Sequence, residues 1–302
     1  MAGGEAIETF PCFGGTVSVI VMGAGPAGSA ASAAAAAKLA MLGWDSQFSR
    51  FDPDSELSRL NGDARVAVRV SPDMARFIEA ALGAALASGG LVDPTLGGEI
   101  EAAGYAEHFD GEPLALARAL ELAPARRPAS PSSQARWREV HLDGTTVTRP
   151  PGVRLDSGGI VKGLFGDILA GALGGHESFA IDCAGDVRLG GRGGLERPIK
   201  VASPFADEIL HLYSLREGAV ATSGVGKRSW LDADGAPAHH LLDPASGRPA
   251  YTGIVQVSAI APSGVEAEWR AKAALLSGPG GARAWLPHGG LVVYDDARVE
   301  LA

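Results

Sequence analysis

The chain has 302 residues, which is long enough to bury a substantial core in one large domain or in two closely packed ones. Hydrophobic residues make up 46% and charged residues 20% of the sequence, as is typical of a globular protein, and the formal net charge is -9. This acidic balance argues against binding to nucleic acid or to an anionic membrane surface. The longest apolar run, residues 29–42, contains Lys38 and is too short to cross a bilayer, so no transmembrane segment is predicted.

The N-terminal residues show no export signal. They carry Glu5 and Glu8 instead of a basic region, and no apolar stretch precedes Cys12 as a lipobox would require. The sequence as it stands therefore predicts a cytoplasmic protein; if a signal had been trimmed from the N-terminus, the periplasm or the cell envelope would be the alternative. The two cysteines, Cys12 and Cys183, have no metal-like spacing and indicate no disulfide framework.

The first part of the chain predicts a strand, two helices and a loop. Residues 16–21 are β-branched and apolar and predict the strand, and the alanine-rich residues 30–42 predict a helix from propensity alone. A second helix is expected to begin at Pro72, with Ser71 as its N-cap, and to end before Gly89. The polar stretch 123–134 is rich in proline and serine and predicts a mobile loop.

The second part of the chain mixes strands and helices. Strands are predicted at residues 199–202, 254–261 and 291–294, and a helix at residues 265–276. Strands and helices do not alternate regularly, and no internal repeat is visible. We therefore predict an α+β fold and not a doubly wound α/β fold.

The stretch VIVMGAGPAGSA, residues 19–30, has the pattern of a dinucleotide-binding turn. An apolar strand is followed by Gly23-x-Gly25-x-x-Gly28 and a helix. Such a unit also needs a second strand that ends in an acidic residue for the ribose. Asp45 lies at a suitable distance, but the residues around it are polar and lack a β-branched run. We interpret the motif as a glycine-rich turn; a dinucleotide-dependent oxidoreductase would require the nucleotide to touch these glycines.

A second glycine turn, in RLDSGGIVKGLFGDIL at residues 154–169, carries a stronger signal. Gly158 and Gly159 allow a tight turn before an amphipathic helix, and Lys162 follows in its first turn. Backbone amides at a helix N-terminus with an ammonium nearby bind phosphate well. The spacing is not that of a P-loop, and the segment alone would equally suit a helix start with a solvated lysine.

Six further stretches accompany this turn in a fixed order. They are CFGGTVSV from residue 12, FSRFDPDSELSRLN from 48, GGLVDPTLG from 89, AIDCAGDVRLGG from 180, AVATSGVGKRSW with AHHLLDPASGRPA from 219, and APSGVEAEWRAKAALLSGP from 261. Together they resemble the ApbE family, the FAD:protein FMN transferases, over nearly the whole of residues 1–302. The resemblance implies an ApbE-like, T-fold-related α+β fold of mixed sheets with flanking helices, in a single compact unit with FAD in a cleft.

The chemistry that the resemblance implies is phosphoryl transfer. FAD is split at its pyrophosphate, the FMN half passes to a Thr or Ser hydroxyl of an acceptor flavoprotein, and AMP leaves. A divalent cation, usually Mg2+, assists. Two alternatives stay open: a homologue that binds FAD without transferring FMN, and an FAD pyrophosphatase that uses water instead of a protein hydroxyl.

The resemblance also implies residues that contact FAD. Phe13 and Phe51 match flavin-contacting positions, and Lys162 matches a position beside the diphosphate. His240 would orient the diphosphate or handle a proton, whereas His239 would point the other way on an extended segment. Each assignment has a purely structural alternative: the Phe rings would belong to the core, the Asp would form a turn, and the Thr or Ser would act as a cap. The full set of implied FAD contacts is Phe13, Phe51, Leu91, Val92, Asp93, Lys162, Thr222, Ser223, His240 and Leu241.

The sequence departs from the family at the metal signature Ala-Asp-Ala-x-Ala-Thr. Here Glu268 replaces the Asp and Lys272 replaces the Thr. A carboxylate can ligate a hard cation, but an ammonium has no lone pair. In one arrangement the Lys272 ammonium replaces the ion, and Glu268, Lys272 and His240 form the catalytic group. In the other, a metal binds through Glu268 and backbone carbonyls near Val161. An ordinary i,i+4 helical ion pair is the structural alternative.

Overall fold

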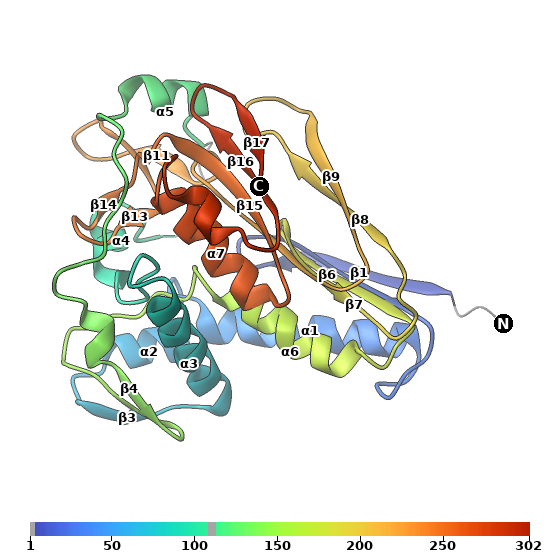
Figure 1. Cartoon of the computed structure of the whole chain (residues 1–302). Helices are drawn as coiled ribbons and strands as arrows, with labels where there is room; N and C mark the ends of the chain where they lie inside the picture. The colour runs from blue at the N-terminus through green and yellow to red at the C-terminus, as the bar shows by residue number, and fades with distance from the viewer. Residues whose placement is uncertain (1–3, 108–112) are drawn as a thin grey trace.

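The computed structural model describes residues 4–107 and 113–302, and an eight-stranded antiparallel sheet forms its centre (Figure 1). The strand order is β1-β2-β6-β7-β10-β15-β16-β17. Alternation of side chains sets the faces: in β2 (Gly15–Met22), Val17, Val19 and Val21 are fully buried on one face. The predicted strand at residues 16–21 is therefore confirmed, and so is the α+β class.

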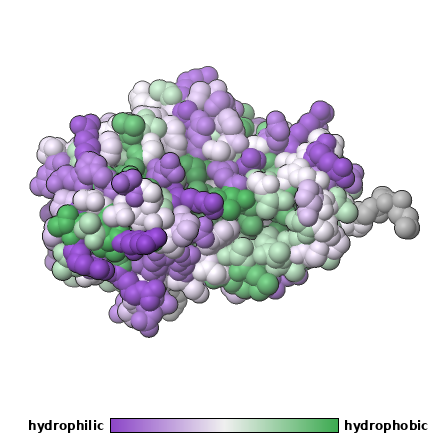
Figure 2. Space-filling view, turned by 90° about the horizontal axis from the view of Figure 1, so that it is seen from below, coloured by the Kyte–Doolittle hydropathy of each residue, from purple (hydrophilic) through white to green (hydrophobic). Residues whose placement is uncertain are grey.

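Helices α1 (Ala30–Phe48), α6 (Val161–Leu173) and α7 (Gly264–Leu276) cover one face of this sheet (Figure 1). The hairpin of β8 (Arg197–Ala202) and β9 (Ile209–Leu215) packs on the other face, where Ile199 joins Ala180 and Val220 of the central strands. Seen from below, where α1 lies, the surface mixes hydrophobic and hydrophilic patches (Figure 2). No helix in the described part of the chain is long and apolar enough to span a membrane.

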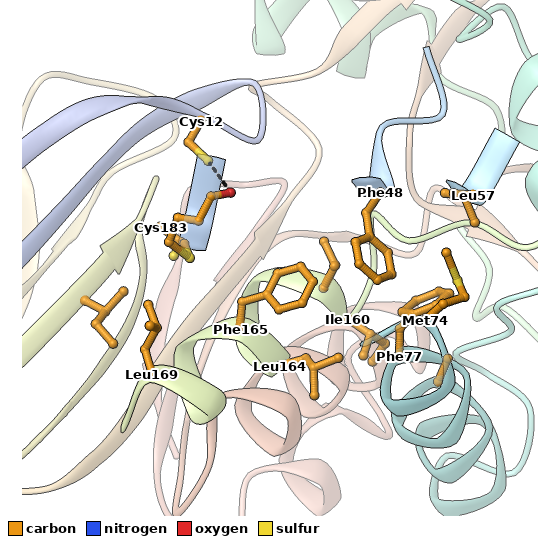
Figure 3. Packing of buried hydrophobic residues seen from close by; sticks show 14 of the residues in the cluster. Cys12, Phe48, Leu57, Met74, Phe77, Ile160, Leu164, Phe165, Leu169 and Cys183 are labelled. Atoms are coloured by element: carbon orange, nitrogen blue, oxygen red, sulfur yellow. Dashed lines mark hydrogen bonds between the residues drawn. The ribbon is translucent and has the colours of Figure 1, made fainter. Parts of the chain in front are cut away.

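A second layer covers the helices on their outer side. It consists of α2 (Glu56–Gly62), α3 (Pro72–Ala87) and the small sheet β3-β5-β4. Figure 3 shows how Phe48, Phe77 and Phe165 meet between α1, α3 and α6, with the Phe48 ring edge-on to both of the others. The side chains of Cys12 and Cys183, in the same hydrophobic cluster, are buried and form no disulfide.

The remaining elements are β1 (Glu5–Cys12), β3 (Ala67–Arg69), α4 (Gly97–Ala102), α5 (Leu116–Leu122), β4 (His141–Asp143), β5 (Thr146–Thr148), β6 (Ser178–Cys183), β7 (Asp186–Gly190), β10 (Gly218–Gly224), β11 (Ser229–Leu231), β12 (Pro237–His239), β13 (Leu242–Asp243), β14 (Arg248–Pro249), β15 (Ile254–Ala261), β16 (Gly290–Tyr294) and β17 (Val299–Leu301), with short 3-10 helices at Arg136–Glu139 and Ala282–Trp285.

Most predicted elements are present, and one boundary was wrong. Helix α1 continues to Phe48 instead of ending near residue 42, because Trp44 and Phe48 pack against the Phe165 ring and this burial outweighs the polar composition of the last turns. The predicted cap of α3 is confirmed: the Ser71 hydroxyl accepts a hydrogen bond from the Met74 amide at 3.1 Å. The strands and helix predicted after residue 190 all exist within about three residues of their expected limits.

The glycine turn at residues 23–28 and the stretch at residues 123–134 were predicted to be irregular. Neither contains a helix, and their strand pairing is limited to an isolated bridge between Gly25 and Gly28. Gly25 and Gly28 form a turn closed by two mutual backbone hydrogen bonds of 3.0 and 2.9 Å, and the His176 ring packs directly against Gly25. The glycine-rich turn is therefore confirmed. Residues 123–134 have neither helix nor strand, and their backbone bonds to Tyr251, Leu276 and Asp243 of the molecule's body. The mobility of this loop stays a prediction.

Two glycines set the distance between α6 and α7. A Cβ atom on Gly163 would lie 2.5 Å from the carbonyl carbon and oxygen of Gly264, and one on Gly264 would lie 2.6 Å from the Gly163 oxygen. Such distances are far shorter than any van der Waals contact, so only glycine allows these backbones to meet. The first turns of α6 and α7 are thereby held in direct contact.

We expect Gly163→Ala to lower the free energy of unfolding by about 1–3 kcal/mol, because one helix must move to admit the methyl group. Gly171→Ala in the same helix is the matched control: its Cβ would meet nothing within 4 Å. The control should be neutral or stabilising by up to ~1 kcal/mol, since alanine favours the helix. Urea-induced unfolding measures both, and equal effects would contradict this description of the contact.

Candidate functional site

A cavity of about 510 Å3 opens where five distant parts of the chain meet. The parts are the β1–β2 turn, the end of α1 with the loop after it, residues 91–105, the start of α6 with the turn before it, and residues 228–276. Its volume is in the range of pockets that enclose a small molecule or cofactor. Ten of the residues selected from the sequence line it: Phe13, Phe51, Leu91, Val92, Asp93, Val161, Lys162, His240, Leu241 and Lys272.

Three selected residues lie outside the cavity wall. Thr222 and Ser223 are on β10, and the Thr222 hydroxyl is within 2.8 Å of the Ser258 hydroxyl. The Thr222 amide donates to the Asp186 carboxylate at 2.9 Å, and Asp186 in turn pairs with Lys162 of the cavity wall. Glu268 is only 2% exposed and lies beneath Lys272. The functional roles of these three residues stay predictions.

The aromatic end of the cavity includes a residue that sequence analysis did not select, Arg50. Its guanidinium carbon lies 4.3 Å from the centre of the Phe51 ring and 4.2 Å from that of Tyr105. Its side chain is 10% exposed, and its Nε is 3.7 Å from the Asp156 carboxylate. The buried Nη2 has no hydrogen-bond partner among the described residues. Arg50 is adjacent to Phe51 in the sequence, but the second ring that it contacts, Tyr105, is 55 residues away. Sequence spacing therefore gave no sign of this contact.

Phe13 reaches the cavity from a strained turn between β1 and β2. Its φ is 51°, an unusual conformation for an aromatic residue, and Gly14 follows with φ 67°. The Phe13 amide donates to the Asp45 carboxylate at 2.9 Å, and its ring stacks on Phe165 with centroids 5.8 Å apart. Asp45 therefore fixes this turn instead of holding a ribose. Phe13 therefore both packs on the buried Phe165 ring and lines the cavity, and its contact with a ligand stays a prediction.

The turn before α6 presents Asp156, Ser157, Gly158 and Gly159 to the cavity. The Ser157 hydroxyl donates to the Phe48 carbonyl at 3.0 Å and so ties the turn to the end of α1. Burial raises the pKa of Asp156, and the positive charges of Arg50, Lys272 and Arg228 oppose that rise. Three cationic side chains thus surround one carboxylate. Asp156 and Arg228 were within the quoted motifs but were not selected as site residues.

Lys162 points from the first turn of α6 toward Asp186, and the two side chains form a close ion pair. Burial lowers the pKa of Lys162, but the carboxylates of Asp186 and Glu268 outweigh this effect and leave its pKa raised. Lys162 is therefore a fixed positive charge at the cavity wall. This position is the one expected from the glycine turn in the sequence.

Glu268 and Lys272 extend from α7 toward the start of α6. One Glu268 oxygen accepts the Gly163 amide at 2.9 Å, and the other is 3.3 Å from the Lys272 ammonium. Both carboxylate oxygens are thus engaged. Among the described residues no group of three or more His, Cys, Asp or Glu side chains could hold a metal. Lys272 does not fit the divalent ion that the sequence resemblance implied, because an ammonium has no lone pair to donate to a metal.

The two adjacent histidines face different surroundings, as expected for an extended segment. His240 lines the cavity, whereas His239 is 1% exposed and packs edge-on to Tyr251 at 4.8 Å between ring centroids. Burial keeps the pKa of His240 well below its usual range, and the positive charge of Arg228 adds to this effect. Burial also lowers the pKa of His239, to about 3. Both rings are therefore neutral near pH 7.

Sequence comparison places these features in a known family: the family model of the ApbE family matches residues 13–294. The chain belongs to the ApbE family. An FAD:protein FMN transferase of Treponema pallidum is 30% identical over 250 residues, which cover 74% of this chain and 66% of that protein. One of Rhodobacter capsulatus is 30% identical over 288 residues, covering 91% of this chain and 52% of that protein. The chain thus spans about half to two thirds of these relatives.

Solved ApbE structures share the fold. The ApbE protein of Thermotoga maritima superimposes with a TM-score of 0.79 at 26% identity, covering 98% of this chain and 96% of that one. The flavin transferase ApbE of Vibrio cholerae gives a TM-score of 0.76 at 20% identity, covering 99% and 96%. The ApbE-like architecture expected from the sequence is therefore confirmed.

The pKa of His239 predicts a stability loss in mild acid. The unfolded chain takes up a proton near the ordinary pKa of 6.5, whereas the folded protein holds this ring neutral until about pH 3. Since the unfolded state binds more protons below pH 6.5, His239 should cost about 2 kcal/mol of folding free energy between pH 7 and pH 5.

His239→Gln removes this titration and keeps a polar side chain of similar length. We expect the unfolding free energy of the wild type, relative to that of the variant, to fall by about 2 kcal/mol from pH 7 to pH 5 in urea titrations. A difference that stays constant with pH would show that His239 is not held neutral in the folded protein.

Proposed function

We propose that this ApbE protein transfers the FMN half of FAD to a Thr or Ser hydroxyl of an acceptor flavoprotein and releases AMP. The observation that carries the proposal is the single cavity with an aromatic end at Phe51 and a cationic end at Lys162 and Lys272, in a chain of this family. In the reaction the acceptor oxygen bonds to the FMN phosphorus. The bond from that phosphorus to the bridging oxygen breaks, its electron pair leaves with AMP, and the hydroxyl proton is released to water or to AMP.

The residues divide by chemistry into two groups. Phe51, Phe13, Leu91, Val92 and Leu241 provide apolar or aromatic surface for the flavin or adenine rings, and Asp93 provides an acceptor. Burial raises the pKa of Asp93. Lys162, Lys272 and the amides of the turn at Gly158 provide positive potential for the diphosphate. In this arrangement Thr222 and Ser223 act only indirectly, through Asp186 and β10.

His240 suits an orienting role better than a proton-transfer role. Its pKa is held well below its usual range by burial and by nearby positive charge, so the ring is a weak base near pH 7. A neutral imidazole can still donate one hydrogen bond to a phosphate oxygen. Its Nδ1 is buried and has no partner among the described residues.

Mg2+ assistance is the second arrangement that the sequence left open, with ligands from Glu268 and a carbonyl near Val161. An ion at Glu268 would lie beside the Lys272 ammonium, which contacts one of the carboxylate oxygens, and the two positive charges would repel each other. The cellular compartment also stays a proposal. We propose the cytoplasm, with the periplasm or cell envelope as the alternative. The compartment determines which acceptor proteins are available to the enzyme.

The decisive experiment incubates the full chain with FAD and a flavoprotein that carries a flavinylated Thr or Ser in its native state, supplied without flavin. We expect AMP in solution and an acceptor mass increased by one FMN residue. AMP release without acceptor would favour FAD hydrolysis, and intact FAD bound without AMP would favour a binding protein. Either result would overturn the proposed transfer.

Phe51→Ala tests the aromatic end of the cavity. Loss of one stacking contact costs about 0.5–1.5 kcal/mol, so we expect the Kd for FAD to rise by up to about tenfold. Phe205→Ala is the control, since Phe205 is 37% exposed and does not line the cavity. Quenching of flavin fluorescence measures both, and an unchanged Kd for Phe51→Ala would remove this residue from the site.

A further inference from the structure

We infer that the Lys272 ammonium takes the place of a metal ion in this protein, so that FAD binding and FMN transfer proceed without a divalent cation. The inference rests on the proposed function and specifies the cation of that site. Its basis is the side-chain geometry between α6 and α7.

The first argument is that Glu268, which would have to supply the side-chain oxygen ligand, already has a donor at each oxygen. Its two oxygens contact the Gly163 amide at 2.9 Å and the Lys272 ammonium at 3.3 Å. The carboxylate is 2% exposed, and turning it toward the cavity would break its hydrogen bond to the Gly163 amide. Both partners donate a hydrogen bond to a carboxylate oxygen, and the carboxylate in turn caps the start of α6.

The second argument is that Lys272 itself faces the cavity. It is among the lining residues, and its side chain is 13% exposed. Its Cε would be 3.4 Å from a Cβ atom on Gly159, so the lysine stem passes close over the anion-binding turn. The ammonium therefore lies where it can donate both to Glu268 and to a ligand held by this turn.

The third argument is charge balance. Lys162 pairs with Asp186, and Lys272 pairs with Glu268, so this buried group of four side chains has no net charge. Both carboxylates of this group are therefore neutralised by an ammonium before any ion arrives, which lowers their attraction for a dication. Arg50 and Arg228 line the same cavity and oppose the buried carboxylate of Asp156 there.

The test measures FAD binding to the full-length protein by fluorescence quenching in excess EDTA and in millimolar MgCl2. We expect the same Kd in both conditions. A Kd that falls tenfold or more on adding MgCl2 would overturn the inference but leave the proposed function intact. Failure to bind FAD in either condition would overturn the proposed function itself.

Two variants distinguish the effect of losing the ammonium from the effect of unfolding the protein. Lys272→Met leaves Glu268 buried without its partner and so risks unfolding. The double variant Glu268→Gln with Lys272→Met removes both charges and keeps the side-chain volumes. We expect it to fold, as circular dichroism can show, and to bind FAD about tenfold or more weakly in EDTA, as loss of a charged hydrogen bond implies. MgCl2 should not restore the affinity.

The converse variant, Glu268→Asp with Lys272→Thr, leaves one uncompensated carboxylate beside a hydroxyl. We expect weak FAD binding in EDTA that MgCl2 restores, and a metal-dependent release of AMP with an acceptor present. Lys200→Met is the control, because Lys200 is exposed on β8 and does not line the cavity; its Kd should equal that of the wild type. Unchanged FAD affinity of Glu268→Gln with Lys272→Met in EDTA would overturn the role of the ammonium.

Discussion

The backbone contact between Gly163 and Gly264 is the constraint on which the site depends. Because neither residue has a Cβ atom, α6 and α7 meet at their first turns. Glu268, one turn into α7, then reaches the Gly163 amide and caps α6 from the side. Lys272, one turn further, reaches the cavity beside Gly159. A single close approach of two helices thus sets the position of the anion-binding turn and of an ammonium relative to each other.

The central sheet acts on the site through this helix pair and through one acidic residue. Strands β10 and β15 carry α7, and β7 supplies Asp186, which holds Lys162. The far end of the cavity is built differently, from the end of α1 and from residues 91–105. Arg50 joins the two ends, since it stacks on Phe51 and Tyr105 and approaches Asp156 of the turn before α6. One side chain thus contacts both the aromatic end of the cavity and the turn at its cationic end.

The sequence predicted what depends on local patterns. The cap at Ser71 and the turn at Gly23–Gly28 follow from residue type and spacing, and the structure has both. The position of Lys162 at the cavity was expected from its glycine turn together with the resemblance to the ApbE family. The sequence could not predict contacts that depend on how distant elements pack. Arg50 lines the cavity beside Tyr105, which is distant in the sequence, and Glu268 is outside the cavity lining, with one oxygen bound to the Gly163 amide of α6 and the other to Lys272.

Local pattern also failed where tertiary packing outweighed composition. The last turns of α1 are polar, yet Trp44 stacks on Phe165 with a centroid distance of 4.3 Å and extends the helix to Phe48. The FAD contact implied for Thr222 stays a prediction, since Thr222 is outside the cavity lining and its amide donates to Asp186.

The most direct test is a crystal structure of the protein with FAD, grown in EDTA and then soaked in MnCl2. The account predicts that the FAD diphosphate lies within hydrogen-bond distance of the Nζ atoms of both Lys162 and Lys272, with no anomalous manganese signal between the phosphates and Glu268. A manganese ion bound to a Glu268 oxygen, or a diphosphate away from both lysines, would contradict it.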